Sequence, residues 1–265
     1  MGNGRRAMTY ETLIYETEGE VGILTYNRPK VVNAINKQMV EELYDFWQAR
    51  QRDFDTRVII VTGAGDKGFC SGLDMKAVVT EFAPPGGATA ESTFDGQIHF
   101  SVLMRLMRSC PQPIIAAVHG PAMGAGLSFA LSADVRLASE DAFFCAQYIN
   151  IGTGGADLSS SFFLPKIVGW GKAAEMCMTG ERVFAQDAYR VGLANHVVTR
   201  EELLPAARAM AAVMCSKNKF GLRMTKDAFN AALNGSSLED ANRMEDRNQA
   251  LIIANAITEG AKELG

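Results

Sequence analysis

Two glycine-rich loops hold the residues of this 265-residue sequence whose types and spacing could do chemistry. The loop GAGDKGFCSGLDMK follows the apolar run at residues 58–61, and the loop HGPAMGAG follows the apolar run at residues 114–118. Such uninterrupted apolar runs predict strands buried on both faces. A bend from a strand into a helix leaves backbone N–H groups unpaired, and the helix dipole adds partial positive charge. Each loop could therefore hold an anion or an oxyanion.

The rest of the chain predicts the elements that position these loops. Residues 11–26 predict a hairpin, and Asn36 is expected to cap a helix with one apolar face. Residues 78–95, rich in Pro, Gly, Ala and Thr, predict a mobile loop, and a helical face follows and ends at Pro111. Further strands are expected at 135–138, 143–151 and 194–198, and helices through Phe162, at 173–178, at 185–191 and throughout the segment after Glu201.

These motifs together resemble the enoyl-CoA hydratase/isomerase (crotonase) family. FCSGLDMK is similar to the family segment F-x-A-G-x-D-[LI]-K, and AAVHGPAMGAG is similar to A-x-x-G-x-A-x-G-G-G, in the same order and spacing. The resemblance extends to Asn27-Arg28-Pro29 with Asn33-Ala34, to TGERVFAQDAYRVGLANHVV at 179–198, and to residues 222–233. It covers nearly the whole chain, whereas the sequence pattern without it predicts only the α/β class.

The resemblance implies a particular architecture and assembly. We expect an α/β crotonase-like spiral of ββα units over residues 1–198, and a C-terminal helical trimerisation region over residues 199–265. Apolar stripes such as residues 251–253 and Ile257 in that region would be partly wet in a monomer. A homotrimer or a dimer of trimers is therefore expected.

For the site, the resemblance implies that the backbone N–H groups of Leu73 and Ala125 form an oxyanion hole that grips a thioester carbonyl as it becomes an enolate. Main-chain donors need no particular side chain, so Leu and Ala can both serve. The family usually has a glycine where Ala125 stands. Its methyl group is tolerated if φ is negative, which is the condition the structure must meet.

The acid and base groups depart from the family pattern. Family hydratases carry two glutamates where this chain has Ser128 and Tyr148. The hydroxyl groups of serine and tyrosine exchange protons poorly near neutral pH. The ordinary two-glutamate hydration mechanism is thus in doubt. Asp157 stands roughly where dienoyl-CoA isomerases of the family carry an aspartate, and we expect it to move the proton with support from Tyr148. As an alternative, Asp157 caps the helix that follows it.

The expected substrate is a small-molecule acyl-CoA, with coenzyme A present as part of the thioester and with no tightly bound cofactor and no metal. Enoyl-CoA hydratase/isomerase chemistry is the main hypothesis. A CoA-thioester hydrolase, a C–C lyase and a catalytically silent CoA-binding scaffold stay open as alternatives. The residues expected to contact coenzyme A are Lys30, Val31, Val32, Gly72, Asp74, Met75, Lys76, Gly124 and Lys226.

Composition and further motifs exclude other classes. A net charge of −4 without a basic run argues against nucleic acid. Apolar runs fall short of the ~20 residues that span a bilayer, and MGNGRRAMTYE lacks a signal core, so a cytoplasmic location is expected. The five cysteines, with no C-x-x-C, predict buried thiols. Dinucleotide and Walker patterns fail on spacing, and the faint nucleophile elbow around Ser128 has no supported histidine partner.

Overall fold

The structure is a computed structural model that describes residues 10–82, 87–235 and 237–263. Its main sheet has the strand order β1-β2-β3-β4-β6-β9, in which β1 and β2 form an antiparallel hairpin and every other neighbouring pair is parallel. A smaller sheet has the order β5-β7-β8. The strands of the main sheet are β1 (Leu13–Glu18), β2 (Val21–Tyr26), β3 (Val58–Gly63), β4 (Ile114–Val118), β6 (Val135–Ser139) and β9 (His196–Val198). Those of the smaller sheet are β5 (Pro121–Met123), β7 (Phe143–Cys145) and β8 (Val183–Phe184).

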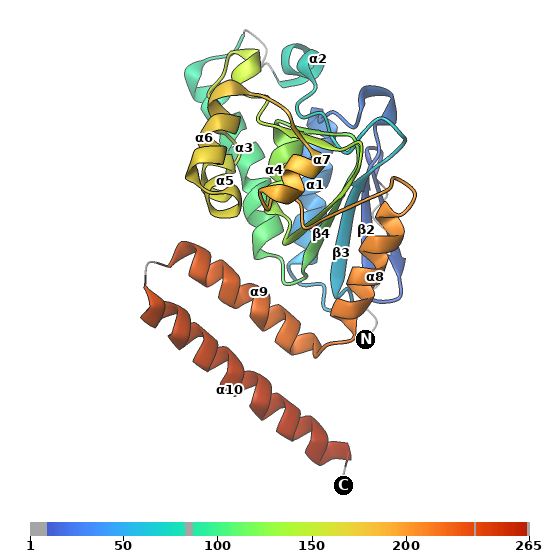
Figure 1. Ribbon diagram of the computed structural model, residues 1–265, viewed down its shortest axis with the longest axis vertical. Coiled ribbons are helices and arrows are strands. Elements are labelled where there is room, and N and C mark those ends of the chain that lie inside the picture. Colours follow the sequence, from blue (N-terminus) through green and yellow to red (C-terminus); the bar gives the residue numbers. More distant parts are fainter. Residues whose placement is uncertain (1–9, 83–86, 236, 264–265) are drawn as a thin grey trace.

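Apolar residues cover both faces of β3 and β4, as the sequence predicts. Ile59 and Ile114 face a core cluster built with α1 (Lys37–Arg50), α3 (Ala90–Ser109) and α4 (Ala125–Ser132), whereas Ile60 and Ile115 pack against α8 (Leu203–Cys215) on the other face. Because alternate side chains point to opposite faces, each strand contributes to both cores. Figure 1 shows α8 on one side of the sheet, away from α1 and α4.

The C-terminal helices leave the body of the fold. Helices α9 (Lys219–Asn234) and α10 (Leu238–Glu263) pack on each other and run antiparallel below the rest of the molecule (Figure 1). Large apolar side chains of α10, including Leu251, Ile253 and Ile257, are exposed. The sequence prediction that everything after Glu201 is mainly helical is confirmed.

Shorter elements lie between these. They are η1 (Pro29–Val31), α2 (Met75–Ala77), η2 (Val78–Phe82), η3 (Ile149–Ile151), α5 (Ser160–Val168), α6 (Trp170–Thr179) and α7 (Ala185–Arg190). The predicted cap is present, since the Asn36 side chain accepts from the backbone N–H of Met39 at 3.1 Å.

All five cysteines are free, and Cys70, Cys110 and Cys145 are buried. In the part of the chain described here, no helix combines the length and apolarity needed to cross a bilayer.

Two expectations from the sequence are wrong in position. Within the expected loop at 78–95, η2 forms one turn and α3 already begins at Ala90, where Thr89 and Ser92 exchange capping-box hydrogen bonds; residues 83–86 lie outside the described residues. The local cap overrides the poor helix-forming composition of this stretch. The strand expected at 143–151 ends at Cys145, and Tyr148 lies in the turn before η3.

Candidate active site

The two glycine-rich loops lie against each other. The Cys70 N–H donates to the Pro121 carbonyl and the Cys70 carbonyl accepts from the Met123 N–H, both at 3.0 Å. A Cβ added to Gly126 would lie 2.2 Å from the Cys70 carbonyl oxygen, so the close approach of the loops requires glycine there. Segments about 50 residues apart in the sequence thus form one wall.

Leu73 and Ala125 bring their backbone N–H groups to this wall. Hydrogen bonds on either side of Leu73 tie its neighbours to Ile35, from the Ile35 N–H to the Gly72 carbonyl (2.8 Å) and from the Asp74 N–H to the Ile35 carbonyl (2.9 Å). Ala125 is the first residue of α4, where helix N–H groups have no intrahelical partner. Among the described residues, neither N–H has a hydrogen-bond acceptor. A Cβ placed on Gly72 would lie 3.5 Å from the Ala125 nitrogen, so the loops nearly touch here.

The backbone at Ala125 does not have the positive φ that would exclude a side chain there. Of the described non-glycine residues, those with positive φ are Val32, Asn33, Leu158 and Ser159, so Ala125 avoids the left-handed region. Gly124 takes the unusual conformation instead, with φ of 52°. A methyl group at Ala125 is therefore compatible with a loop that more often has glycine at this position.

A pocket of about 470 Å³ opens beside the two N–H groups. Several residues predicted from the sequence line it, namely Val31, Gly72, Leu73, Asp74, Met75, Gly124, Ala125, Tyr148 and Asp157. Lys30 and Lys76 are exposed and adjoin the lining residues Val31 and Met75 in the sequence, whereas Val32 lies next to Val31 with a φ of 55°. Ser128 is fully buried behind the lining.

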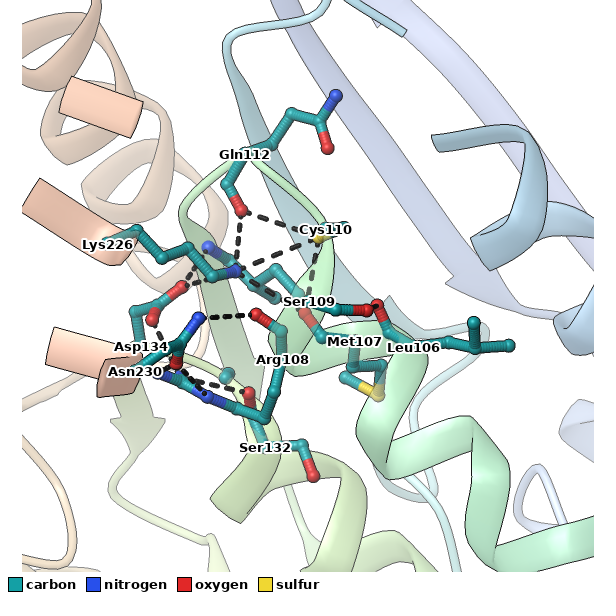
Figure 2. Close-up of polar contacts among 12 residues, drawn as sticks. Leu106, Met107, Arg108, Ser109, Cys110, Gln112, Ser132, Asp134, Lys226 and Asn230 are labelled. Carbon is teal, nitrogen blue, oxygen red and sulfur yellow. Dashed lines mark hydrogen bonds and ion pairs between the residues drawn. The ribbon is translucent and has the colours of Figure 1, made fainter. Parts of the chain in front are cut away.

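Lys226 is the exception among the residues predicted to contact coenzyme A. It is 4 % exposed on α9, its Nζ donates to the Gln112 carbonyl at 2.7 Å, and it forms an ion pair with Asp134 at 3.0 Å (Figure 2). None of these partners lines the 470 Å³ pocket. The prediction for Lys226 is corrected: its charge serves a buried contact between α9 and the core.

Tyr148 and Ser128 form a hydrogen-bonded pair at the back of the pocket. The Tyr148 hydroxyl lies 2.5 Å from the Ser128 Oγ and donates to the Gly124 carbonyl at 2.6 Å. With its proton directed at that carbonyl, Tyr148 accepts from Ser128. Burial raises the pKa of Tyr148 well above its ordinary value, against the lowering effect of the Ser128 hydrogen bond. The phenol therefore stays protonated at neutral pH.

Asp157 presents its carboxylate to the same pocket. Its Oδ1 accepts from the Gln97 side chain at 2.5 Å and from the Leu158 N–H at 2.7 Å. Burial raises its pKa, and these two hydrogen bonds offset only part of that rise. The cap of α5 is Ser159, so the alternative prediction that Asp157 caps this helix is wrong. Gln97, from α3, was missed by sequence reasoning because no local pattern links it to Asp157.

The other carboxylate in the described lining is Asp74. Burial alone would raise its pKa, but the hydrogen bond and charge of Arg28 (Nη1 to Oδ2, 3.0 Å), together with two backbone N–H donors, lower it. Asp74 is therefore held ionised as the cap of α2. Of the two carboxyl groups, Asp157 is the one whose pKa moves toward neutrality, which is what proton transfer at physiological pH requires.

Two further groups, Asp141 and a histidine base, take no part in this geometry. Asp141 forms an ion pair with Arg200 at 2.8 Å and is absent from the pocket lining. Ser128 has Tyr148, Asp157 and Ser132 as its hydrogen-bond partners in the described chain, and no histidine is among them. A histidine-activated serine nucleophile at this position is therefore not favoured.

The fold and site together define a crotonase-fold enzyme. Residues 16–263 match the model of the enoyl-CoA hydratase/isomerase family, and the chain belongs to that family. It is 35 % identical over 230 residues to the crotonyl-CoA hydratase of Syntrophomonas wolfei, covering 85 % of this chain and 84 % of the relative.

Solved structures agree. The crystal structure of a putative enoyl-CoA hydratase from Streptomyces coelicolor is similar with a TM-score of 0.88 and 29 % identity, covering 96 % of this chain and 90 % of the other. That of a putative enoyl-CoA hydratase from Thermobifida fusca in complex with CoA gives 0.83 and 28 % identity, covering 93 % and 95 %.

Proposed function

We propose that the protein acts on an acyl-CoA thioester, and that the N–H groups of Leu73 and Ala125 bind the thioester oxygen as it gains negative charge. The observation that carries the proposal is the meeting, in one pocket, of two acceptor-free N–H groups and a carboxyl group with a raised pKa. Donors preorganised toward a developing oxyanion typically contribute about 3 kcal/mol each to transition-state stabilisation. The structure in complex with CoA from Thermobifida fusca supports CoA as the carrier.

Asp157 is assigned as the group that moves the proton. Its carboxylate takes a proton from C2, the carbon between the thioester carbonyl and the double bond, and the electron pair moves onto the thioester oxygen. As that pair returns into the acyl chain, the proton is delivered to the far carbon of the conjugated system. The double bond shifts, and no water is consumed. A single acid/base group can carry out both transfers, whereas water addition by the family pattern uses two carboxylates.

Double-bond isomerisation is therefore the reaction this geometry favours. Hydration is the second candidate, because the relative from Syntrophomonas wolfei is named a crotonyl-CoA hydratase. For hydration, Asp157 would act alone on water, since Tyr148 directs its proton to Gly124 and Ser128 has no acidic proton near neutral pH. Thioester hydrolysis, C–C cleavage and a silent scaffold remain as weaker hypotheses.

We infer that the coenzyme A part binds along Val31, Met75 and Gly124, which line the pocket. The exposed cations Lys30 and Lys76, next to Val31 and Met75 in the sequence, are suited to bind phosphate groups. We assign no such role to Lys226, which is committed to Asp134.

A substrate panel tests the proposal. Purified protein is incubated with 3-enoyl-, 2-enoyl-, dienoyl- and 3-oxoacyl-CoA thioesters, and products are separated by chromatography with mass detection. We expect 3-enoyl- or dienoyl-CoA to be converted to an isomer of unchanged mass. A gain of 18 mass units would establish hydration instead, and release of free CoA would establish hydrolysis. Binding without any turnover would support the silent scaffold.

A further inference from the structure

A second pocket, of about 390 Å³, lies between α9 and the core. Its walls come from α4, α5, α8, α9 and the start of β6, and it shares no lining residue with the candidate active site. We call it the α9 pocket. Nothing in the proposed chemistry uses it.

One side of the α9 pocket is a cluster of partly and fully buried charges (Figure 2). Asp134 lies between two cations, with Oδ1 2.7 Å from Arg108 Nη1 and Oδ2 3.0 Å from Lys226 Nζ. Burial raises the pKa of Asp134, but Lys226 and Arg108 lower it to below its ordinary value. The carboxylate is therefore ionised, and it is shared by two positive charges.

Among the described residues, no carboxylate forms an ion pair with the third cation in the lining, Arg136, although the charge of Asp134 raises its pKa in part. Arg136 is 6 % exposed, and it donates through Nε to the Leu193 carbonyl at 2.7 Å and through Nη1 to the Ala133 carbonyl at 2.9 Å. Within the described chain, its Nη2 has no hydrogen-bond acceptor. Burial lowers the pKa of Arg136 to about 10, which leaves it charged at neutral pH.

The charges in this cluster do not balance. Three cations, Arg108, Arg136 and Lys226, lie near one anion, Asp134, which leaves a net charge of +2 in this cluster. A buried charge without a counter-charge is costly, so an anion that enters the pocket gains from it. Lys166, exposed on α5, adds another positive charge to the lining.

The other walls are apolar. They include Leu131, Val135, Phe163, Ile167, Leu222 and Leu233. A small inorganic anion would leave these walls wet, whereas a ligand with an apolar body would cover them. We propose that the α9 pocket binds a monocarboxylate with a short apolar chain, its carboxylate on Arg136 and its chain against the apolar walls. Bound there, it contacts both α9 and the core.

The test is calorimetric titration of the full chain with octanoate. The control ligand is 1-octanol, an uncharged analogue with the same chain length. We expect saturable octanoate binding at one site and at least about tenfold weaker binding of octanol, because the alcohol lacks the charge. Thr225 is an exposed residue of α9 in the lining. Thr225→Trp should fill the pocket and weaken octanoate binding at least about tenfold. Lys166→Gln should weaken octanoate binding less, and Lys172→Gln, at a partly buried lysine outside the pocket, should leave it unchanged.

Competition separates this site from the active site. Octanoyl-CoA at saturation should not displace octanoate, and Asp157→Asn should bind octanoate like the wild type. No binding, equal affinity for octanol, displacement by octanoyl-CoA, or unchanged affinity in a folded Thr225→Trp protein would each overturn the proposal. None of these results would bear on the enolate chemistry, which is read from turnover.

Discussion

The Ser128 Oγ and the Tyr148 hydroxyl lie 2.5 Å apart, at the two positions where hydratases of this family are expected to carry glutamates. Instead of two carboxylates facing a water molecule, the chain has two neutral groups bonded to each other. Tyr148 also holds the carbonyl of Gly124, the residue before Ala125. The pair thus holds the loop that presents one proposed oxyanion donor, and Asp157 is the proposed proton carrier.

Asp157→Asn should lower turnover of the thioester by about 100- to 10,000-fold, because asparagine keeps the size and cannot take a proton. Tyr148→Phe, measured beside it, should lower turnover much less, because it removes a hydrogen bond that holds the loop but no proposed proton-transfer group. The measurement is kcat on the best thioester of the panel. If Asp157→Asn keeps wild-type turnover and Tyr148→Phe has none, the acid/base group is the tyrosine and the assignment to Asp157 is wrong.

Ala125→Pro should abolish turnover while the protein remains folded. Proline removes the N–H proposed to bind the thioester oxygen, and the first position of a helix tolerates proline. The matched control is Ala125→Gly, which keeps the N–H and should remain active. Circular dichroism checks the fold. Activity in a folded Ala125→Pro protein would contradict the assignment of the Ala125 N–H as an oxyanion donor.

Gln97→Leu should alter the pH profile of turnover. Removing the hydrogen bond from Gln97 to Asp157 leaves burial to raise the carboxyl pKa further. The acidic limb of kcat against pH should therefore shift to higher pH. The isosteric Gln97→Glu also loses that amide donor and places a second carboxyl beside Asp157, so it should shift the limb in the same direction. An unchanged profile in both variants would contradict the assignment of that limb to Asp157.

The chain should assemble as a trimer or a dimer of trimers. Leu251, Ile253 and Ile257 on α10 are exposed in the single chain, and α10 packs on α9 alone among the larger contacts of the described elements. Such apolar surface is commonly covered by another subunit. Light scattering at micromolar concentration gives the mass. A monomer mass would remove the argument that these helices serve assembly.

The free energy of unfolding should fall as pH drops from 6.5 to about 4, in part through His119. Burial, aided by the charge of Arg200, lowers the pKa of His119 from 6.5 to about 4, so the folded protein keeps it neutral where the unfolded chain takes up a proton. The contribution reaches at most about 3 kcal/mol. In urea melts across this range, the free energy of unfolding of the wild type should fall more steeply with decreasing pH than that of His119→Gln. Parallel curves would contradict the assignment.

Lys226→Met should lower the free energy of unfolding by about 1 to 3 kcal/mol, because it leaves the Gln112 carbonyl without its lysine donor, whereas Asp134 keeps its ion pair with Arg108. The measurement is the urea midpoint at constant slope. Lys219→Met, an exposed lysine on the same helix, should change stability by less than about 0.5 kcal/mol. Equal effects would show that the α9 contact contributes little.

Local patterns in the sequence determined the strands, the loops and the family. The runs at 58–61 and 114–118 are apolar throughout, so they are buried on both faces wherever the chain places them. The place of Gly126 in a strand-to-helix bend was readable from its spacing, whereas the approach of Cys70 that requires glycine there belongs to the packed fold. The apolar runs and the bend depend on residues close together in the chain, which is why sequence reasoning reached them.

The tertiary structure alone decided the roles of individual side chains. Lys226 meets Asp134 across 92 positions, Gln97 meets Asp157 across 60, and Tyr148 meets Ser128 across 20. No periodicity carries such contacts, because they arise when elements formed by local rules pack together. Lys226, expected to contact coenzyme A, is instead buried, and Tyr148, expected on a strand, donates its hydroxyl proton to the Gly124 carbonyl. The physical reason is that burial and partners, which set charge and pKa, belong to the packed fold.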